Sequence, residues 1–298
     1  GIRSDSDMHT LGYSFKPWKH EKAIADGPAI LDYIHETARE YGVEQHIHYN
    51  HRVEHLSWDS MSATWSIVLK VNGQDNVSMT CNFVYSCTGY YRYDQGYMPE
   101  FPGAGAFKGE IIHPQKWPEN LDYSDKKVVV IGSGATAITL VPSMATSAAH
   151  VTMLQRSPTY VISRSEKDST AKTLERYLPD QVAYWATRWK NVLSQMILYR
   201  MSKRRPDYIR RKLIEWTQIW LGKDFDVATH FSPRYNPWDQ RLCLVPNGDL
   251  FRSLRKGTSS VVTDHISRFT AEGIELESGK VLDADIIVSA TGLELLAL

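Results

Sequence analysis

The sequence has 298 residues, with 34 basic and 34 acidic side chains and 42% hydrophobic residues. This composition indicates a globular protein of about two domains, and the zero formal net charge gives no sign of a nucleic-acid partner. The cysteines Cys81, Cys87 and Cys243 lack metal-ligand spacing, and their odd number argues against a disulfide scaffold. No apolar run approaches the length of a bilayer span, and the first residues lack a signal-peptide pattern. We therefore expect a cytoplasmic protein without a metal site.

The N-terminal part of the sequence is polar before its first regular element. Residues 1–27 predict a loop. Residues 28–42 predict a helix, because Pro28 suits the first helical turn and Gly42 suits a helix end. The sequence begins with Gly1 in a loop-like run and stops just after a strand-like run, so we expect an internal fragment of a longer protein.

Two stretches of the sequence end in the same way. Residues 82–89, NFVYSCTG, and residues 285–292, DIIVSATG, both predict short apolar strands that end in Ser-x-Thr-Gly. Each follows a hairpin-like segment with a turn pair, Asn-Gly at 72–73 and Ser-Gly at 278–279. The repeat predicts two related units along one chain.

A dinucleotide-binding fingerprint follows, in the run KVVVIGSGATA. Residues 128–131 predict a buried strand, Gly132 allows a tight turn, and Gly134 lets the backbone approach a pyrophosphate. Ala137 allows close helix–strand contact, and the first N–H groups of the helix attract phosphate. A tight turn without a ligand is the alternative. The expected cofactor contacts in this loop are Gly132, Ser133, Gly134, Ala135, Thr136, Ala137 and Ile138.

The second strand of this unit, HVTMLQRSPTY, indicates which dinucleotide is bound. An NAD site usually ends this strand with Asp or Glu, which binds the ribose 2′-hydroxyl. Here the strand ends in Gln155, Arg156 and Ser157, and an arginine can pair with a 2′-phosphate. NADP is therefore favoured, with a solvated surface arginine as the alternative. The run GAGAFKG at 103–109 lacks a preceding strand and predicts only a turn, so the first Thr-Gly ending has no phosphate loop, which we expect upstream of Gly1.

The segment before the phosphate loop, FKGEIIHPQKWP, resembles the fingerprint FxGxxxHxxxWP of Baeyer–Villiger monooxygenases, a class of flavin monooxygenases. The matching residues are Phe107, Gly109, His113, Trp117 and Pro118. The run GIRSDSDMHTLGYSF and the two Thr-Gly endings also resemble this family, so the resemblance covers essentially the whole chain. It implies an α/β fold class with two Rossmann-like dinucleotide-binding domains, of which the FAD domain is incomplete.

The resemblance also implies domain bounds. Residues 1–90 would form a partial FAD-binding domain without its phosphate loop, and 91–125 an inter-domain linker. Residues 126–288 would form the NADP-binding domain, with a helical insert at about 166–235. Residues 289–298 would return toward the FAD domain.

The activity implied by the resemblance is that of an FAD- and NADPH-dependent monooxygenase. NADPH reduces FAD, the reduced flavin captures O2, and a C4a-peroxyflavin attacks a ketone to give an ester or lactone. The same oxidant oxygenates the sulfur of thioamides or sulfides. A nitrogen- or sulfur-oxygenating flavin monooxygenase and an inactive NADP-binding remnant remain alternatives, and the Trp-Pro end of the fingerprint favours the Baeyer–Villiger class. The substrate, its regiochemistry and the oligomeric state are not predicted, and we expect this chain alone not to hold FAD tightly.

Two charged residues match the catalytic positions of the family. Arg241 matches the active-site arginine, whose permanent charge would stabilise an anionic oxidant. Asp5 matches its carboxylate partner, with an Asx-type turn as the alternative. Gln240 stands where the family often has Lys near the 2′-phosphate, which weakens the preference for NADP. Further cofactor contacts are implied for Arg3, Ser4, Asp5, Val53, Thr88 and Gly89, and His113 is implied as a hydrogen-bonding latch between domains, with Trp117 in a packing role.

The expected insert is both aromatic and basic. Residues 185–223 contain ten Lys or Arg and two Asp or Glu, together with Trp185, Trp189, Trp216 and Trp220. A solvated helical face around an apolar core is one interpretation. The other is a substrate vestibule or a peripheral membrane contact, since Trp together with Lys and Arg suits a membrane interface.

Overall fold

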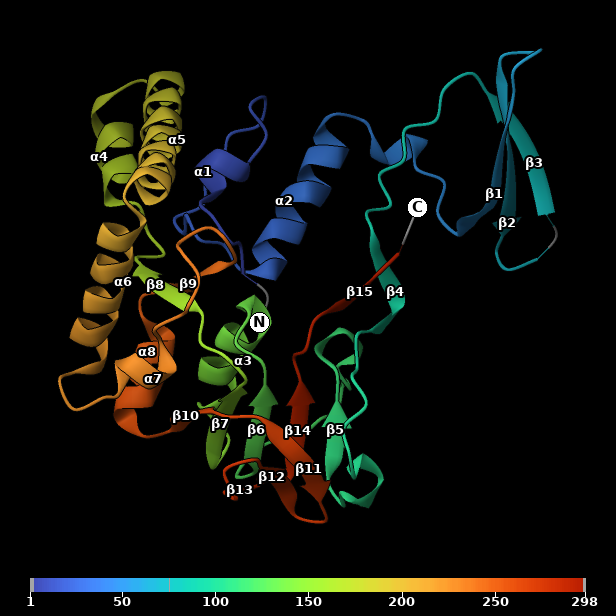
Figure 1. Ribbon diagram of the computed structural model, residues 1–298. Helices are drawn as coiled ribbons and strands as arrows, with labels where there is room; N and C mark the ends of the chain where they lie inside the picture. The colour runs from blue at the N-terminus through green and yellow to red at the C-terminus, as the bar shows by residue number, and fades with distance from the viewer. Residues whose placement is uncertain (1–2, 75, 297–298) are drawn as a thin grey trace. The chain divides into compact units, whose positions relative to one another are not determined.

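The computed structural model describes residues 3–74 and 76–296 (Figure 1). Contacts between residues divide the chain into two compact units. Unit 1 comprises residues up to 30 together with 92–294, and unit 2 comprises 31–91 together with the residues from 295 onward. The N-terminal segment thus groups with the later part of the chain, unlike in the expected division at residue 90. The assignment of FAD and NADP domains stays a prediction.

Unit 1 is built on a parallel sheet with the strand order β10-β7-β6-β14-β5 (Figure 1). Every neighbouring pair in this sheet is parallel. The chain moves outward from β6 to β7 and β10, then returns to the other side of β6 at β14, as in doubly wound folds. The strands are β5 (Glu110–Ile112), β6 (Lys127–Ile131), β7 (His150–Gln155), β10 (Ser259–Thr263) and β14 (Ile286–Ser289).

The side chains of β6 alternate between two cores. Val128 and Val130 pack in a cluster with helices α3 and α8, whereas Val129 and Ile131 pack in a cluster with the antiparallel sheet β11-β12-β13. All four are at most 7% exposed, as expected for a parallel strand covered on both faces. The covering elements are α3 (Ala135–Met144), α8 (Asp249–Lys256), β11 (Ile266–Thr270), β12 (Gly273–Leu276) and β13 (Val281–Asp283).

The family fingerprint contributes a strand to this sheet. Residues 110–112, expected to lie in a linker, pair with β14, and Ile112 is buried in the helix-side core. Three residues between Gly109 and a His-Pro pair are too few to give a periodic signal, so the sequence did not predict this strand. The turn expected at 103–109 is confirmed as a 3-10 helix (Ala104–Ala106), which follows Gly103 at a φ of 75°.

The insert between β8 and β9 is helical, as expected. Strands β8 and β9 pair in parallel beside the main sheet. Within the part of the chain that the structure describes, no helix is long and apolar enough to cross a bilayer. The elements are β8 (Tyr160–Arg164), α4 (Ser169–Tyr177), α5 (Asp180–Arg204), α6 (Pro206–Leu221), α7 (Val227–His230) and β9 (Leu242–Pro246).

The N-terminal segment, expected to be a polar loop, is in fact packed into unit 1. Trp18 and Ala25 are at most 2% exposed, and the Trp18 indole N–H donates to the Lys22 carbonyl at 2.9 Å. The Ala23 N–H donates to the Glu166 carbonyl at 2.7 Å. The polar composition of the segment concealed its packing, because Glu166 lies far away in the sequence. The segment contains α1 (Met8–Leu11) and leads into α2 (Gly27–Glu40), close to the predicted helix.

Two short strands cross near the ends of the main sheet. Strand β4 (Tyr91–Gly96) pairs with β15 (Leu293–Leu295). Arg92 pairs with Glu294 at 3.0 Å, and Gln95 donates to the same carboxylate at 2.5 Å.

Unit 2 is built on the antiparallel sheet β1-β2-β3. The hairpin predicted at residues 72–73 is confirmed, because Asn72 and Gly73 both have positive φ and the Gln74 N–H donates to Val71. Val53, an implied cofactor contact, is 53% exposed beside a register shift in β1. The strands are β1 (His51–Asp59), β2 (Thr64–Val71) and β3 (Asn76–Cys81).

The prediction of a strand at 82–89 is wrong. These residues form no strand, and Phe83 and Tyr85 are 76% and 80% exposed. A buried parallel strand requires a hydrogen-bonded neighbour, and no strand of the described chain pairs with this segment.

Candidate functional site

The glycine-rich loop after β6 has the geometry that the fingerprint predicts. Gly132 has a φ of 133°, and a Cβ there would lie 2.5 Å from the Ala290 carbonyl oxygen, so only glycine fits. A Cβ at Gly134 would have no neighbour within 4 Å, so this part of the backbone is open to an approaching ligand. Gly134 is the N-cap of α3, and Ala137 is fully buried against the sheet. The loop therefore offers helix N–H groups to a phosphate.

A cavity of about 620 Å³ lies along this loop. It is located where the strand order reverses between β6 and β14, which is the usual ligand position in doubly wound sheets. Its volume is within the range of small-molecule sites. Its lining includes five expected cofactor residues, Gly132, Ser133, Gly134, Arg156 and Ser157, together with residues 99–102, 264–266 and 290–292.

The end of β7 contributes a positive charge to this cavity. Arg156 is exposed, and the Ser133 hydroxyl donates to the Ser157 carbonyl at 3.2 Å, which joins the loop to the strand end. Asp264, at the end of the neighbouring β10, also lines the cavity, and its pKa is lowered chiefly by a hydrogen bond with Ser278. An arginine at the strand end beside an open phosphate loop fits a dinucleotide with a 2′-phosphate.

His113 of the fingerprint ties two segments of unit 1 together. Its Nδ1 accepts from the Gln115 N–H at 3.2 Å, so Nε2 carries the proton and donates to the Gly292 carbonyl at 2.9 Å. The ring packs on Gly96, where a Cβ would lie 1.9 Å from it. The latch expected between domains therefore joins β4, the fingerprint and the segment after β14, and its role between FAD and NADP domains stays a prediction.

The other fingerprint residues pack in unit 1. Phe107 meets Phe269 edge to face at 6.4 Å, and a Cβ at Gly109 would lie 2.1 Å from the Asp285 carbonyl. The Pro118 carbonyl accepts from the Leu121 N–H at 3.3 Å. Packing and the path of the chain therefore account for the residue types at these positions.

Trp117 packs edge to face on Tyr123 at 6.4 Å. Both rings line a second cavity of about 470 Å³, on which the N-terminal segment and the start of α3 also border. The expected site residues are thus not gathered in one cavity, and Arg241 lines neither of these two. Those that line this second one are Arg3, Asp5, Trp117, Ala135 and Thr136.

The three N-terminal site residues have different surroundings. Arg3 forms an ion pair with Asp249 at the start of α8. The Ser4 hydroxyl accepts from the Ala25 N–H at 3.0 Å. Asp5 is exposed and lines two cavities. Their contact with a cofactor stays a prediction.

Arg241 precedes β9, and its backbone is held in place. Its carbonyl accepts from the Tyr235 hydroxyl at 3.1 Å and from the Thr159 hydroxyl at 3.2 Å, while its side chain is exposed. Burial raises the pKa of the nearby Cys243 thiol to about 11, with Arg241 acting to lower it and Asp5 to raise it. The two predicted catalytic charges therefore act on the same neighbourhood, although no ion pair between them is found among the described residues. The predicted orientation of Arg241 by Asp5 stays a prediction.

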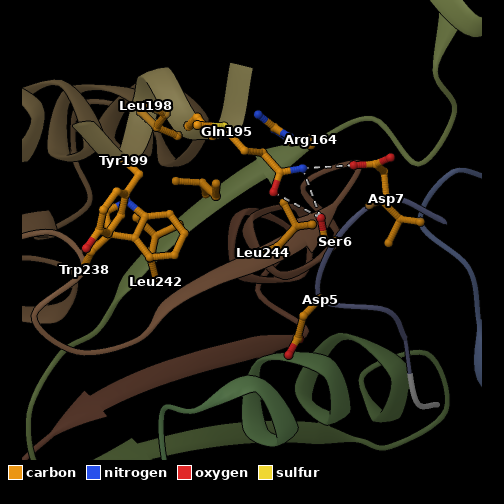
Figure 2. Close-up of a pocket in the computed structure, with 13 residues that line it drawn as sticks. Asp5, Ser6, Asp7, Arg164, Gln195, Leu198, Tyr199, Trp238, Leu242 and Leu244 are labelled. Atoms are coloured by element: carbon orange, nitrogen blue, oxygen red, sulfur yellow. Dashed lines mark hydrogen bonds between the residues drawn. The ribbon is translucent and has the colours of Figure 1, made fainter. Parts of the chain in front are cut away.

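A third cavity, of about 320 Å³, was not located by the sequence (Figure 2). It is apolar along β8, β9 and α5, and Figure 2 shows Tyr199, Trp238 and Leu242 grouped on one side, with Asp5 apart from them. Gln195 donates to Asp7 at 3.0 Å and closes another side. The aromatic insert predicted a vestibule as one alternative, but the lining residues come from four distant segments. Remaining members of the lining are Ser6, Ile24, Ile162, Arg164, Met196, Leu198 and Leu244.

The expected flavin contacts in unit 2 are exposed. They are Val53 in β1 and the Thr88-Gly89 pair, of which Gly89 has a φ of 70°. Within residues 3–74 and 76–296, a single glycine-rich loop joins a parallel strand to a helix, and that loop fits NADP. The described residues therefore do not by themselves provide a phosphate loop for FAD.

A family model described as flavin-binding monooxygenase-like matches residues 17–295. The chain belongs to the flavin-binding monooxygenase-like family. This membership confirms, at the level of the family, the resemblance carried by the fingerprint segment and the phosphate loop. The predicted α/β fold class with a parallel dinucleotide-binding sheet is confirmed as well.

Curated relatives of this family member are longer than the chain. It is 54% identical over 296 residues to the FAD-containing monooxygenase EthA of Mycobacterium tuberculosis, a match that covers 99% of the chain and 60% of EthA. It is 51% identical over 296 residues to the probable FAD-binding monooxygenase AlmA of Acinetobacter baylyi, covering 99% and 59%. The chain therefore spans about 60% of the length of these relatives.

Solved structures share the fold of this family member. An oxidized steroid monooxygenase bound to NADP matches with a TM-score of 0.78 at 22% identity, covering 99% of the chain and 63% of that protein. A cyclohexanone monooxygenase bound to ε-caprolactone also matches with a TM-score of 0.78, at 17% identity, covering 99% and 65%. Identities this low support the fold alone.

Proposed function

We propose that this chain is part of an FAD- and NADPH-dependent monooxygenase that inserts one oxygen atom of O2 next to a ketone carbonyl. The observation that carries the proposal is the cavity at the open phosphate loop, with Arg156 at its edge. The family and the FAD in the names of its relatives support the flavin. In this proposal residues 126–288 bind NADPH, whereas residues 1–90 and 289–298 contribute to the flavin side.

The residues of the NADPH cavity have separate roles in this proposal. The N–H groups at the start of α3 bind the pyrophosphate beside Gly134. Arg156 pairs with the 2′-phosphate, because a guanidinium offers parallel N–H donors to phosphate oxygens. His113 holds the segment after β14 against the fingerprint, which keeps one wall of this cavity in place.

Bound FAD, once reduced by NADPH, supplies the oxygen activation. Arg241 stabilises negative charge that develops on the reacting atoms. Asp5, which borders two cavities, orients the guanidinium or contacts the cofactor. The apolar cavity beside Asp5 binds the apolar part of the substrate and excludes water.

Product analysis with isotopically labelled O2 tests this function. The longer protein of which this chain is proposed to be part is purified and supplied with FAD and NADPH, and is given a ketone in one reaction and a thioether or thioamide in another. We expect an ester or lactone that carries one labelled oxygen atom. Sulfur oxidation without ester formation would instead assign the protein to the nitrogen- and sulfur-oxygenating class, and NADPH binding without any oxygenation would assign it to an inactive remnant.

We also propose a cytoplasmic location in contact with a membrane surface. The proposal is supported by the aromatic and basic composition of residues 185–223.

A further inference from the structure

The exposed face of helix α5 is apolar, unlike that of an ordinary surface helix. Its apolar side chains are exposed at the spacing of one helical face, with Trp189 at 54%, Leu193 at 51% and Ile197 at 57%. The side turned toward the rest of unit 1 carries Asn191 and Gln195. An exposed apolar stripe on a 25-residue helix indicates a surface that something else covers.

Polar contacts fix the orientation of this helix. The Asn191 amide donates to Asp7 at 2.9 Å, and the Gln195 amide donates to the same carboxylate at 3.0 Å. Lys190 pairs with Asp168 at 2.6 Å. Rotating α5 to bury its apolar stripe would leave the largely buried Asp7 carboxylate without these donors, which is costly. The polar contacts that orient α5 within unit 1 therefore keep the stripe exposed.

The stripe, which we call the α5 apolar face, has a basic end. It consists of Val182, Trp185, Trp189, Leu193 and Ile197. The exposed Arg200, Arg204 and Arg205 follow at the C-terminal end of the helix. The neighbouring α6 adds exposed Trp216 and Ile219, and Arg211 lies over the Tyr208 ring at 5.9 Å.

Charge selects among the possible partners of this face. Residues 185–223 carry ten Lys or Arg against two Asp or Glu, whereas the whole chain is neutral. A two-fold symmetric dimer through this face would bring together two patches of the same net positive charge, which is unfavourable. An anionic bilayer instead attracts the basic end, and its interface takes up tryptophan and aliphatic side chains. Helix α5 is about 37 Å long but is not apolar enough to cross a bilayer, so it would lie along such a surface.

We propose that the α5 apolar face docks on an anionic lipid bilayer, with Trp189 and Leu193 inserted and Arg200 and Arg204 at the headgroups. This inference specifies the membrane location proposed above and rests on it. It is independent of the oxygenation chemistry, because vesicle binding is measured without substrate, FAD or NADPH.

Sedimentation with vesicles tests the docking. The purified protein is mixed with vesicles of phosphatidylcholine alone or with added phosphatidylglycerol, at low and high salt. We expect co-sedimentation with the phosphatidylglycerol vesicles that weakens with salt. Replacing Arg200 and Arg204 by Gln should weaken partition about 25-fold, at about fivefold for each removed charge near an anionic surface.

A matched pair of apolar substitutions separates insertion from general stickiness. Leu193→Ser should weaken vesicle binding severalfold, whereas Val281→Ser, at the similarly exposed Val281 of β13, should leave it unchanged. Equal binding by parent and Leu193→Ser, or no binding to anionic vesicles at low salt, would overturn the proposal. A self-association that Leu193→Ser abolishes in sedimentation velocity, without vesicle binding, would overturn it in favour of a second copy.

Discussion

Residues 82–89 and 285–292 share the ending Ser-x-Thr-Gly but not a structure. Within the second stretch, β14 is hydrogen-bonded to β6 on one side and β5 on the other, and Ile287 is fully buried. The first stretch forms no strand, and Phe83 is 76% exposed. The same local pattern thus becomes a central strand only where neighbouring strands pair with it. Burial of an apolar strand is a property of its surroundings more than of its residues.

The strongest test of this difference truncates a buried side chain in the second stretch and an exposed side chain in the first. Ile287→Ala should lower the free energy of unfolding by about 2–5 kcal/mol, because it leaves a cavity between two covered faces of the sheet. Phe83→Ala should change it by no more than about 0.5 kcal/mol, since the ring is mostly in solvent. Chemical denaturation measures both. Similar losses in the two variants would mean that 82–89 is packed as tightly as β14.

The contacts that hold the second ending in place provide the next test. Gly96→Ala should destabilise the protein by about 1–3 kcal/mol, because the new methyl group overlaps the His113 ring that binds Gly292. Gly105→Ala is the control, because a Cβ there meets nothing within 4 Å. Thermal unfolding compares the two. A Gly96→Ala protein as stable as the Gly105→Ala protein would show that the His113 contact moves aside at no cost.

Cofactor preference tests the phosphate loop beside the second ending. Arg156→Ala should weaken NADP+ binding about tenfold or more, because a charge-assisted hydrogen bond to the 2′-phosphate is lost. NAD+ binding should be unaffected. Titration calorimetry measures both affinities, with Arg268→Ala, an exposed arginine of β11 paired with Glu275, as the control. An equal loss for both dinucleotides would assign Arg156 a role other than 2′-phosphate recognition.

Thiol labelling gives the smallest but most local comparison. Cys87 in the first stretch is exposed and should react rapidly with a disulfide reagent. Cys243 should react only on unfolding, because it is buried and burial raises its pKa to about 11, which leaves little thiolate at pH 8. In a Cys87→Ser background, Ala290→Cys places a thiol at the equivalent position of the second stretch and should react more slowly than Cys87. Equal reaction rates of the two thiols would show that the two positions do not differ in packing.

Local chemistry was enough to predict the phosphate loop and the first hairpin. Gly132 and Gly134 at fixed spacing after an apolar run, and Asn72-Gly73 between alternating strands, each determine their backbone without distant partners. The predicted backbone of both segments is confirmed, because the signal and the structure lie within a few residues of each other, and phosphate binding stays a prediction.

Features that depend on distant partners were not predictable. Trp18 and Ala25 are buried in a segment of polar composition, and this segment is held by distant residues, since the Ala23 and Ile24 N–H groups both donate to the Glu166 carbonyl. Strand β5 forms because it pairs with β14. Residues 82–89 have no such pairing strand among the described strands. The apolar cavity beside Asp5 is likewise assembled from four separate segments, so no single run of sequence carries its signal.

Gly132 of the expected phosphate loop closely approaches Ala290, the first residue of the segment 290–292 that follows β14. Both other residues of this segment are hydrogen-bonded to Tyr97. The Thr291 hydroxyl donates to the Tyr97 carbonyl at 2.7 Å, and the Gly292 carbonyl accepts from the Tyr97 N–H at 3.2 Å. Backbone contacts therefore lead from the paired strands β4 and β15 to the expected phosphate loop through a segment only a few residues long.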